Sequence, residues 1–221
     1  MSNSNRILEA YVGEYASGKS EVAINRALSL VNGEPVTLVD LDLVEPFYTL
    51  RPLKDELTQC GLHVVAWKTT ETLGIGETGM IMKPEARWAL KRVGNVILDV
   101  GYGAYGTTVL NLLEGYPSAE LKVLVVINVA RPMTSTVDDI TSYLNDFKQI
   151  DGLINNSNLG DKTDLSVIRR GVEIVSKAGV SLGLPVVATT VEKRFQCDLG
   201  EADHYGNPVH YLTRYMQRAF W

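Results

Sequence analysis

The chain has 221 residues, a formal net charge of −5 and a hydrophobic content of 45%. This composition is typical of a packed soluble domain. The acidic balance argues against broad, non-specific nucleic-acid binding, which depends on Lys and Arg contacts to phosphates. No apolar run approaches the ~20 residues of a membrane-spanning helix, and no apolar signal core follows the N-terminal residues. We therefore expect a cytoplasmic protein.

Strand-like and helix-like segments alternate along the whole chain. In chain order, the pattern predicts a strand at 7–12, a helix at 19–31, a strand at 35–41, a helix at 53–60, a strand at 62–67, a helix at 84–93, a strand at 95–100, a helix at 108–113, a strand at 121–129, a helix at 134–147, a strand at 152–155, a helix at 164–178 followed by Gly179, a last strand at 184–188 and a terminal helix at 204–221. Continuous apolar strands indicate burial on both faces. We expect a single α/β domain over residues 1–221, with a mostly parallel sheet and helices on both faces.

Residues 13–20 read Gly-Glu-Tyr-Ala-Ser-Gly-Lys-Ser and match the phosphate-binding P-loop, G-x-x-x-x-G-K-[ST]. Two glycines permit turns at which a Cβ would clash, so that the loop N–H groups form a nest for phosphate oxygens at the start of a helix. Lys19 is expected to place its ammonium between the β- and γ-phosphates, and Ser20 to coordinate Mg²⁺. The predicted nucleotide-contacting residues are Gly13, Glu14, Tyr15, Ala16, Ser17, Gly18, Lys19, Ser20 and Glu21.

Two aspartates, Asp40 and Asp42, end the strand predicted at 35–41, where open α/β sheets bind ligands. Residues two apart on an extended chain point to the same side. One carboxylate is therefore expected to hold a Mg²⁺-bound water while the other orients the attacking water. The alternative is a solvated, acidic loop start, which the flanking apolar residues disfavour.

A second acidic strand end follows at 96–101, which reads Val-Ile-Leu-Asp-Val-Gly and looks like a Walker B element. Asp99 is expected to contact Mg²⁺ directly or through water. Gly101 is expected to let its backbone N–H approach the γ-phosphate, so that the following loop senses the nucleotide. The alternative is that Asp99 is a turn residue.

Residues 101–106 also fit the dinucleotide fingerprint G-x-G-x-x-G. That fingerprint requires an acidic residue at the end of the next strand. The strand predicted at 121–129 instead has Asn128 near its end. NAD binding therefore ranks below the P-loop interpretation.

Two further segments have a composition or an apolar pattern that bears on function. Residues 68–83 are rich in Thr and Gly and form either a functional lid or a surface excursion. The helix predicted at 204–221 has an apolar face that includes Tyr211, Leu212 and Tyr215 but carries only a thin basic face. That pattern favours packing on the sheet or on a partner subunit over membrane contact.

The order of these motifs resembles the MinD/ParA/Mrp and nitrogenase-iron-protein class of P-loop NTPases, called the SIMIBI class, and the CobQ/CobB/MinD/ParA nucleotide-binding domain family. The resemblance spans roughly residues 7–191 and also includes Gly-Leu-Ile-Asn-Asn-Ser-Asn at 152–158. It implies a mostly parallel sheet of seven or eight strands, Mg-ATP binding, a nucleotide-controlled homodimer and a protein partner.

The resemblance also implies residue roles. Asp42 orients the hydrolytic water, Asp40 helps to hold the Mg²⁺ shell, and Asn156 hydrogen-bonds the adenine edge, with residues 189–191 lining the same pocket. An amide suits adenine because it carries a donor and an acceptor side by side. The guanine-reading Asn-Lys-x-Asp pattern does not occur on a suitable loop, so ATP is favoured over GTP.

Glu14 departs from the family pattern. Many relatives carry a second lysine at this position, which reaches the partner's nucleotide across the dimer. A carboxylate repels phosphates unless it is turned away. Hydrolysis then depends on another cation, for which Lys68, Lys83 and Arg131 are candidates, or dimer-activated hydrolysis is absent.

Three functions stay open on the sequence. The first is a slow Mg-ATP hydrolase or nucleotide switch that acts on a protein partner. The second is an ATP-dependent small-molecule kinase or ligase on the same scaffold, and the third is a nucleotide-binding adaptor that does not hydrolyse. Nitrogenase-like electron transfer is disfavoured because the CxxC pair of iron–sulfur carriers is missing from the sequence.

Overall fold

Eight strands form the central sheet of the computed structural model, which describes residues 6–43, 50–68, 71, 81–117 and 120–216. The order is β3-β2-β4-β1-β5-β6-β7-β8, and each neighbouring pair runs parallel. The strands are β1 (Leu8–Gly13), β2 (Val36–Leu41), β3 (His63–Val65), β4 (Asn95–Val100), β5 (Lys122–Ile127), β6 (Gly152–Asn155), β7 (Val186–Glu192) and β8 (Val209–Leu212). The predicted α/β fold with a mostly parallel sheet is confirmed.

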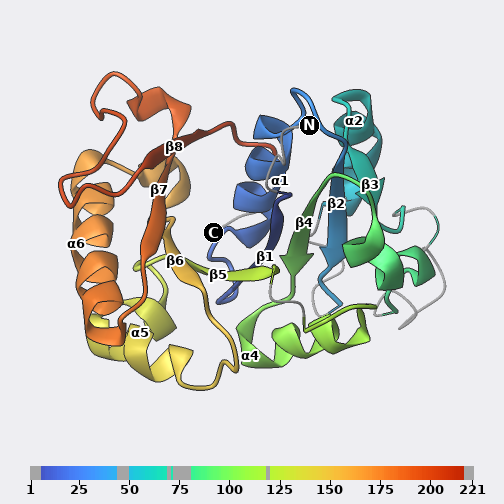
Figure 1. The fold of residues 1–221 in the computed structure, drawn as a ribbon. Helices are drawn as coiled ribbons and strands as arrows, with labels where there is room; N and C mark the ends of the chain where they lie inside the picture. The colour runs from blue at the N-terminus through green and yellow to red at the C-terminus, as the bar shows by residue number, and fades with distance from the viewer. Residues whose placement is uncertain (1–5, 44–49, 69–70, 72–80, 118–119, 217–221) are drawn as a thin grey trace.

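Helices cover both faces of this sheet (Figure 1). The α-helices are α1 (Lys19–Ser29), α2 (Lys54–Gln59), α4 (Gly103–Gly106), α5 (Val137–Leu144) and α6 (Leu165–Leu182), and the 3₁₀ helices are η1 (Arg51–Leu53), η3 (Pro84–Lys91), η4 (Thr107–Leu112), η5 (Pro132–Thr134), η6 (Gly160–Lys162) and η7 (Lys193–Phe195). On one face, α1 and α2 bury Ile24 and Leu57. On the other, α5 and α6 bury Ile140 and Val175.

The strands β2 and β4 are buried along their whole length, as their continuous apolar runs predict. Their side chains alternate between the two layers: Leu38 and Ile97 pack with α1, whereas Val39 and Leu98 pack on the opposite face. Complete burial of one such side chain contributes about 1.5–3 kcal/mol. The carboxyl ends of β2 and β4 are therefore anchored in the core.

Helix α6 is longer than predicted, because Gly179 does not end it. The helix continues to Leu182 and ends at Gly183, whose φ is +67°. A Cβ on Gly179 would come within 2.8 Å of the Leu184 carbonyl oxygen. Gly179 therefore permits close packing inside the helix, and the left-handed terminator is the glycine four residues later. The helices predicted at 84–93 and 108–113 are the 3₁₀ helices η3 and η4.

The terminal helix predicted from residue 204 is wrong, because an eighth strand, β8, lies parallel to β7. Val209 packs on the α6 side of the sheet, and Leu212 packs on the α1 side. Residues three apart face opposite sides of a strand but the same side of a helix. The apolar residues Tyr211, Leu212 and Tyr215 have the spacing of one helix face, but they do not belong to one element. The strand ends at Leu212, and Tyr215 lies in the segment that follows along α1.

Parts of two predicted segments lie outside the described residues: 69–70 and 72–80 of the predicted lid, and 217–221 at the end of the chain. Among the residues that are described, no helix has the length and apolar character needed to cross a membrane.

Candidate functional site

The P-loop, residues 13–20, joins β1 to α1 as the motif predicts. Gly13 has a φ of +151°, and a Cβ there would come 2.4 Å from the Val126 carbonyl oxygen. Gly18 precedes α1 with a φ of +90°, and a Cβ there would come 2.2 Å from Nδ2 of Asn156. Both positions therefore require glycine. The loop leads into the amino end of α1, where free N–H groups and the helix dipole favour anions.

The P-loop side chains contact the loop itself and the segment after β4. Lys19 is buried, and its Nζ donates to the Glu14 carbonyl oxygen at 3.1 Å. Burial and then the charge of Glu14 raise the pKa of Tyr143 in α5 well above its usual value. Tyr15 is exposed, and its ring meets that of Tyr102 edge-on, with 5.8 Å between centroids. The loop thus contacts the segment after β4 through Tyr15.

Asp99 is a buried carboxylate at the carboxyl end of β4, directly beside Asp40 of β2 in the strand register. Its side chain is fully buried, and neither oxygen has a hydrogen-bond partner among the described residues. Burial raises the pKa of Asp99 to about 8; the nearby Ser20 hydroxyl lowers it, and the charges of Asp40 and Asp42 raise it. A buried carboxylate without a partner is costly unless a cation compensates it.

The oxygen donors around Asp99 fit Mg²⁺. A hydroxyl from Ser20 and carboxylates from Asp99 and Asp42 are the hard ligands that this ion prefers. Within the described residues, no group of three His, Cys, Asp or Glu side chains is placed to hold a metal by itself. Such a sparse protein set is typical of Mg²⁺, which keeps several waters and binds one or two protein ligands together with substrate phosphates.

Asp40 is bound by Arg51, a residue that the sequence did not point to. The Arg51 Nε donates to the Asp40 carboxylate at 2.8 Å, and the two side chains are only 3% and 1% exposed. The same carboxylate accepts the Asp42 N–H at 3.0 Å, and Arg51 Nη2 donates to the Asp42 carbonyl oxygen at 3.4 Å. Burial raises the pKa of Asp40 to about 6, against the lowering effect of Arg51. The pair braces the backbone at Asp42, and a place for Asp40 in the Mg²⁺ shell stays a prediction.

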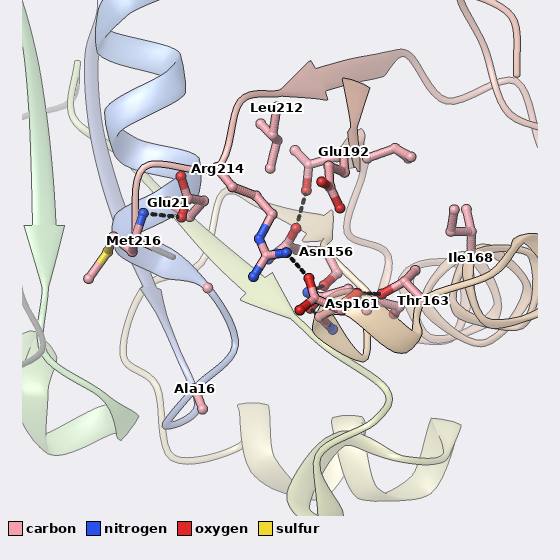
Figure 2. A pocket seen from close by; sticks show the side chains of 16 residues that line it. Ala16, Glu21, Asn156, Asp161, Thr163, Ile168, Glu192, Leu212, Arg214 and Met216 are labelled. Carbon is pink, nitrogen blue, oxygen red and sulfur yellow. Dashed lines mark hydrogen bonds and ion pairs between the residues drawn. The ribbon is translucent and has the colours of Figure 1, made fainter. Parts of the chain in front are cut away.

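A cavity of about 510 Å³ adjoins the P-loop (Figure 2). It is lined by the P-loop and α1, by residues 156–163 after β6, by β7 and by the residues that follow β8. Of the residues expected to surround a base, Asn156, Thr190 and Val191 line it, whereas Thr189 does not. Its volume is in the range of about 300–1,000 Å³ that small-molecule sites occupy.

Asn156 joins the P-loop to the sheet. Its Nδ2 donates to the Ser17 carbonyl oxygen at 2.8 Å, and its Oδ1 accepts the Thr190 hydroxyl at 2.8 Å. The amide is therefore engaged within the protein, and it fixes the loop from the side of the cavity. Its predicted contact with an adenine edge stays a prediction.

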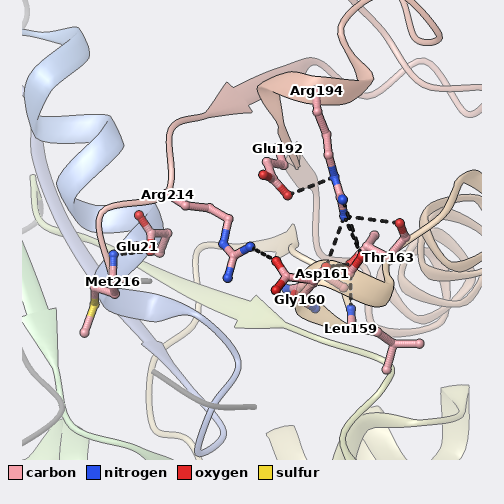
Figure 3. Close-up of polar contacts among 10 residues, drawn as sticks. Glu21, Leu159, Gly160, Asp161, Thr163, Glu192, Arg194, Arg214 and Met216 are labelled. Atoms are coloured by element: carbon pink, nitrogen blue, oxygen red, sulfur yellow. Dashed lines mark hydrogen bonds and ion pairs between the residues drawn. The ribbon is translucent and has the colours of Figure 1, made fainter. Parts of the chain in front are cut away.

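Charged side chains surround the same cavity (Figure 3). Arg214, which follows β8, forms an ion pair with Asp161 in η6. Glu192 at the end of β7 forms another with Arg194, at 3.1 Å. Burial raises the pKa of Glu21, although two backbone N–H groups that hydrogen-bond to it oppose the rise. The sequence predicts Glu21 only as a neighbour of the loop. The partners Arg214 and Asp161 are too far apart along the chain to be inferred from local pattern.

The glycine-rich segment after β4 is a tight turn into α4. A Cβ on Gly106 would come 2.3 Å from the Gly101 carbonyl oxygen, so Gly106 serves local packing. Strand β5 is followed by Asn128, which is buried and whose Oδ1 accepts the N–H groups of Ala130 and Asn158 at 3.0 and 3.2 Å. The dinucleotide interpretation lacks the acidic residue that it requires.

The three candidate replacement cations lie in different places. Arg131 is at the P-loop, where its Nε donates to the Ala16 carbonyl oxygen at 3.1 Å. Lys68 instead pairs with Asp55 at 2.8 Å. Lys83 Nζ donates to a backbone oxygen after β3, at 3.4 Å. Of the three, Arg131 is the one in contact with the loop.

Comparison with known proteins supports the fold. No family model matches the chain, and no curated protein does. The crystal structure of cell division protein FtsY from Thermotoga maritima superposes with a TM-score of 0.55 at 16% identity, over 86% of this chain and 63% of that one. The signal recognition particle receptor FtsY from Elizabethkingia anophelis, in complex with GDP, gives 0.55 at 15% identity over 89% and 60%.

A third structure, FlhF complexed with GMPPNP and Mg²⁺, gives a TM-score of 0.52 at 13% identity over 84% of this chain and 66% of that one. The chain spans about three-fifths of the length of the two FtsY structures. At these identities the likeness concerns the fold alone, which is the α/β fold of P-loop NTPases. Membership of the SIMIBI class, which the motif order indicates, therefore stays a prediction. MinD/ParA-like membership stays a prediction.

Proposed function

We propose that the chain binds Mg-ATP at the P-loop and acts as a slow ATPase or nucleotide switch on a protein partner. One observation carries the proposal: a glycine-built phosphate cradle lies beside a buried, unpartnered carboxylate, Asp99, and opens into a cavity of about 510 Å³. These are the three surroundings that a nucleoside triphosphate with Mg²⁺ requires for its phosphates, its metal and its base.

Each residue then has a definite task. The N–H groups of residues 13–20 bind phosphate oxygens, and Lys19 exchanges its bond to the Glu14 carbonyl oxygen for the β- and γ-phosphates. Ser20 and Asp99 hold the metal. Bound Mg²⁺ supplies charge neutralisation at the β- and γ-phosphate oxygens. Asp42 orients the attacking water, and the buried pair of Asp40 and Arg51 keeps its backbone in position.

ATP is proposed over GTP on the residues after β6. Positions 155–158 read Asn-Asn-Ser-Asn, without the lysine and aspartate of the guanine-reading pattern. The matched FtsY from Elizabethkingia anophelis is in complex with GDP and FlhF with GMPPNP, so the preference needs its own measurement. Competition between the two purine triphosphates for one site, with Mg²⁺ present, decides the point, and tighter GTP binding would remove ATP from the proposal.

Slow turnover of the isolated chain follows from Glu14. The family's second loop lysine is replaced by a carboxylate, so the cation that completes the site comes from elsewhere. Arg131 is the candidate for this cation, because it already contacts the loop backbone at Ala16. A protein partner or a second copy of the chain is then expected to raise the rate. Light scattering with and without Mg-ATP tests the proposed nucleotide-dependent homodimer.

Phosphate release tests the proposed hydrolysis. The wild type is expected to release phosphate slowly, Lys19→Ala to lose both binding and release, and Asp42→Ala to bind Mg-ATP but release at least about tenfold less phosphate. Equal release by all three proteins refutes hydrolysis at this site. A screen of metabolites for ATP consumption separates the alternative kinase or ligase, and binding without any turnover identifies an adaptor.

A further inference from the structure

Residues 213–216, which follow β8, form a strap along α1 at the edge of the cavity. The Asn25 side chain accepts the Thr213 N–H at 2.8 Å and donates to its carbonyl oxygen at 2.9 Å. One turn nearer the P-loop, Glu21 accepts the N–H groups of Tyr215 and Met216 at 2.6 and 3.0 Å. Residues four apart share a helix face. The strap is therefore fastened at two points to the helix that begins at the phosphate cradle.

Arg214 lies between these two fastening points, and its side chain extends away from α1 over the cavity (Figures 2 and 3). Its guanidinium reaches Asp161 on the opposite rim, in η6. The Asp161 side chain is 88% exposed and the Arg214 side chain 29%. An ion pair with one partner in solvent contributes little, so the pair with Asp161 is not required to hold the guanidinium over the cavity.

The position of Arg214 suits the base end of a nucleotide. Ala16 and Gly18 of the P-loop line the same cavity as Arg214, so a triphosphate on the loop has its ribose and base directed into the space beneath the guanidinium. A guanidinium is planar and stacks on aromatic faces, which an ammonium does not do equally well. The Asn156 amide, which was expected to contact the base edge, already hydrogen-bonds to Ser17 and Thr190. Stacking on the face of the base is therefore a mode of base recognition that remains open.

We infer that Arg214 is a specificity-determining residue of the nucleotide site, whose guanidinium stacks on the purine base. The inference rests on the proposed function, because it requires a triphosphate on the P-loop. It assigns base recognition to the strap after β8, in addition to the loop after β6. It also distinguishes two ligands: a nucleoside triphosphate uses Arg214, whereas inorganic tripolyphosphate does not reach it.

Calorimetric titrations of the full chain with Mg-ATP and with Mg-tripolyphosphate test this. Arg214→Ala is expected to weaken ATP binding about tenfold or more and to leave tripolyphosphate binding unchanged. Arg194→Ala is the matched control. Arg194 donates to the carbonyl oxygens of Gly160 and Thr163 and so supports the same loop, but it does not line the cavity. The control is expected to bind both ligands like the wild type.

Two further variants separate stacking from charge. Arg214→Lys keeps the charge without the plane and is expected to bind ATP as weakly as the alanine variant. Asp161→Asn removes the ion pair but keeps the guanidinium and is expected to retain wild-type ATP affinity. The inference is overturned if Arg214→Lys binds ATP with full wild-type affinity, or if Asp161→Asn or Arg194→Ala loses as much ATP affinity as Arg214→Ala. It is also overturned if Arg214→Ala loses affinity for both ATP and tripolyphosphate, or for neither. A wild type that binds neither ligand refutes the proposed function itself, and a wild type that binds both leaves that function standing whatever the variants do.

Discussion

Gly18 offers a quantitative test of how the P-loop is built. Replacing it by alanine places a Cβ at a φ of +90°, 2.2 Å from Nδ2 of Asn156. The left-handed backbone costs an L-residue about 1–2 kcal/mol, of which the reduced entropy of the unfolded chain returns about 0.4–1 kcal/mol. The Asn156 amide must also move, and it gives up its buried bonds to Ser17 and Thr190. At about 1 kcal/mol for each bond, the total loss is about 3 kcal/mol.

Gly206 provides the matched control. Its φ is +84°, close to that of Gly18, but a Cβ there has nothing within 4 Å. Gly206→Ala therefore carries the backbone strain alone and is expected to cost about 1 kcal/mol. Urea unfolding measures both variants. In an Asn156→Ala background the clash is gone, so Gly18→Ala is expected to cost no more than the control. The reasoning is refuted if Gly18→Ala costs the same as Gly206→Ala in the wild type, or loses as much in both backgrounds.

Two other substitutions have expected outcomes. Above the raised Asp99 pKa of about 8 the buried carboxyl is charged, so in a buffer above that pKa Asp99→Asn removes a buried charge. It is expected to raise the Tm without nucleotide, by about 2–4 °C per kcal/mol gained at this chain length, and to abolish the further rise on adding Mg-ATP; thermal melts at that pH that show a lower Tm, or an undiminished ligand response, contradict this. Burial raises the pKa of Asp203, but hydrogen bonds from Thr189 and Asn207 outweigh it and hold the pKa below the usual value. A lowered pKa stabilises the fold above the unfolded-state pKa, and this effect is lost as the pH falls through the folded-state pKa. Asp203→Asn is therefore expected to destabilise the fold at pH about 7, by an amount that shrinks as the pH falls through the lowered pKa of Asp203. A pH-independent difference in urea unfolding rules this out.

The features that the sequence predicts well are those carried by local pattern. The P-loop is identified by eight consecutive residues, and β4 and β6 match their predicted bounds because each is a short apolar run between turn residues. Asp40 and Asp99 are adjacent because parallel strands bring their carboxyl ends to one edge of the sheet. Topology alone therefore accounts for that part of the candidate site.

The features that the sequence does not predict depend on long-range contacts. Arg51 binds Asp40 from η1, and nothing in its neighbourhood distinguishes it from a solvated arginine except the apolar Leu50 before it, which is fully buried. Arg214 meets Asp161 only after β8 has added to the sheet edge. The prediction of a terminal helix failed for a different, local reason: a four-residue edge strand has too few residues to show its alternation.

Isothermal titration calorimetry of the wild type with ATP in the presence of Mg²⁺ tests the central claim most directly. Saturable heat with one nucleotide per chain, and its loss in Lys19→Ala, are the predicted results. An absence of heat with both ATP and GTP contradicts the claim that this loop holds a nucleoside triphosphate.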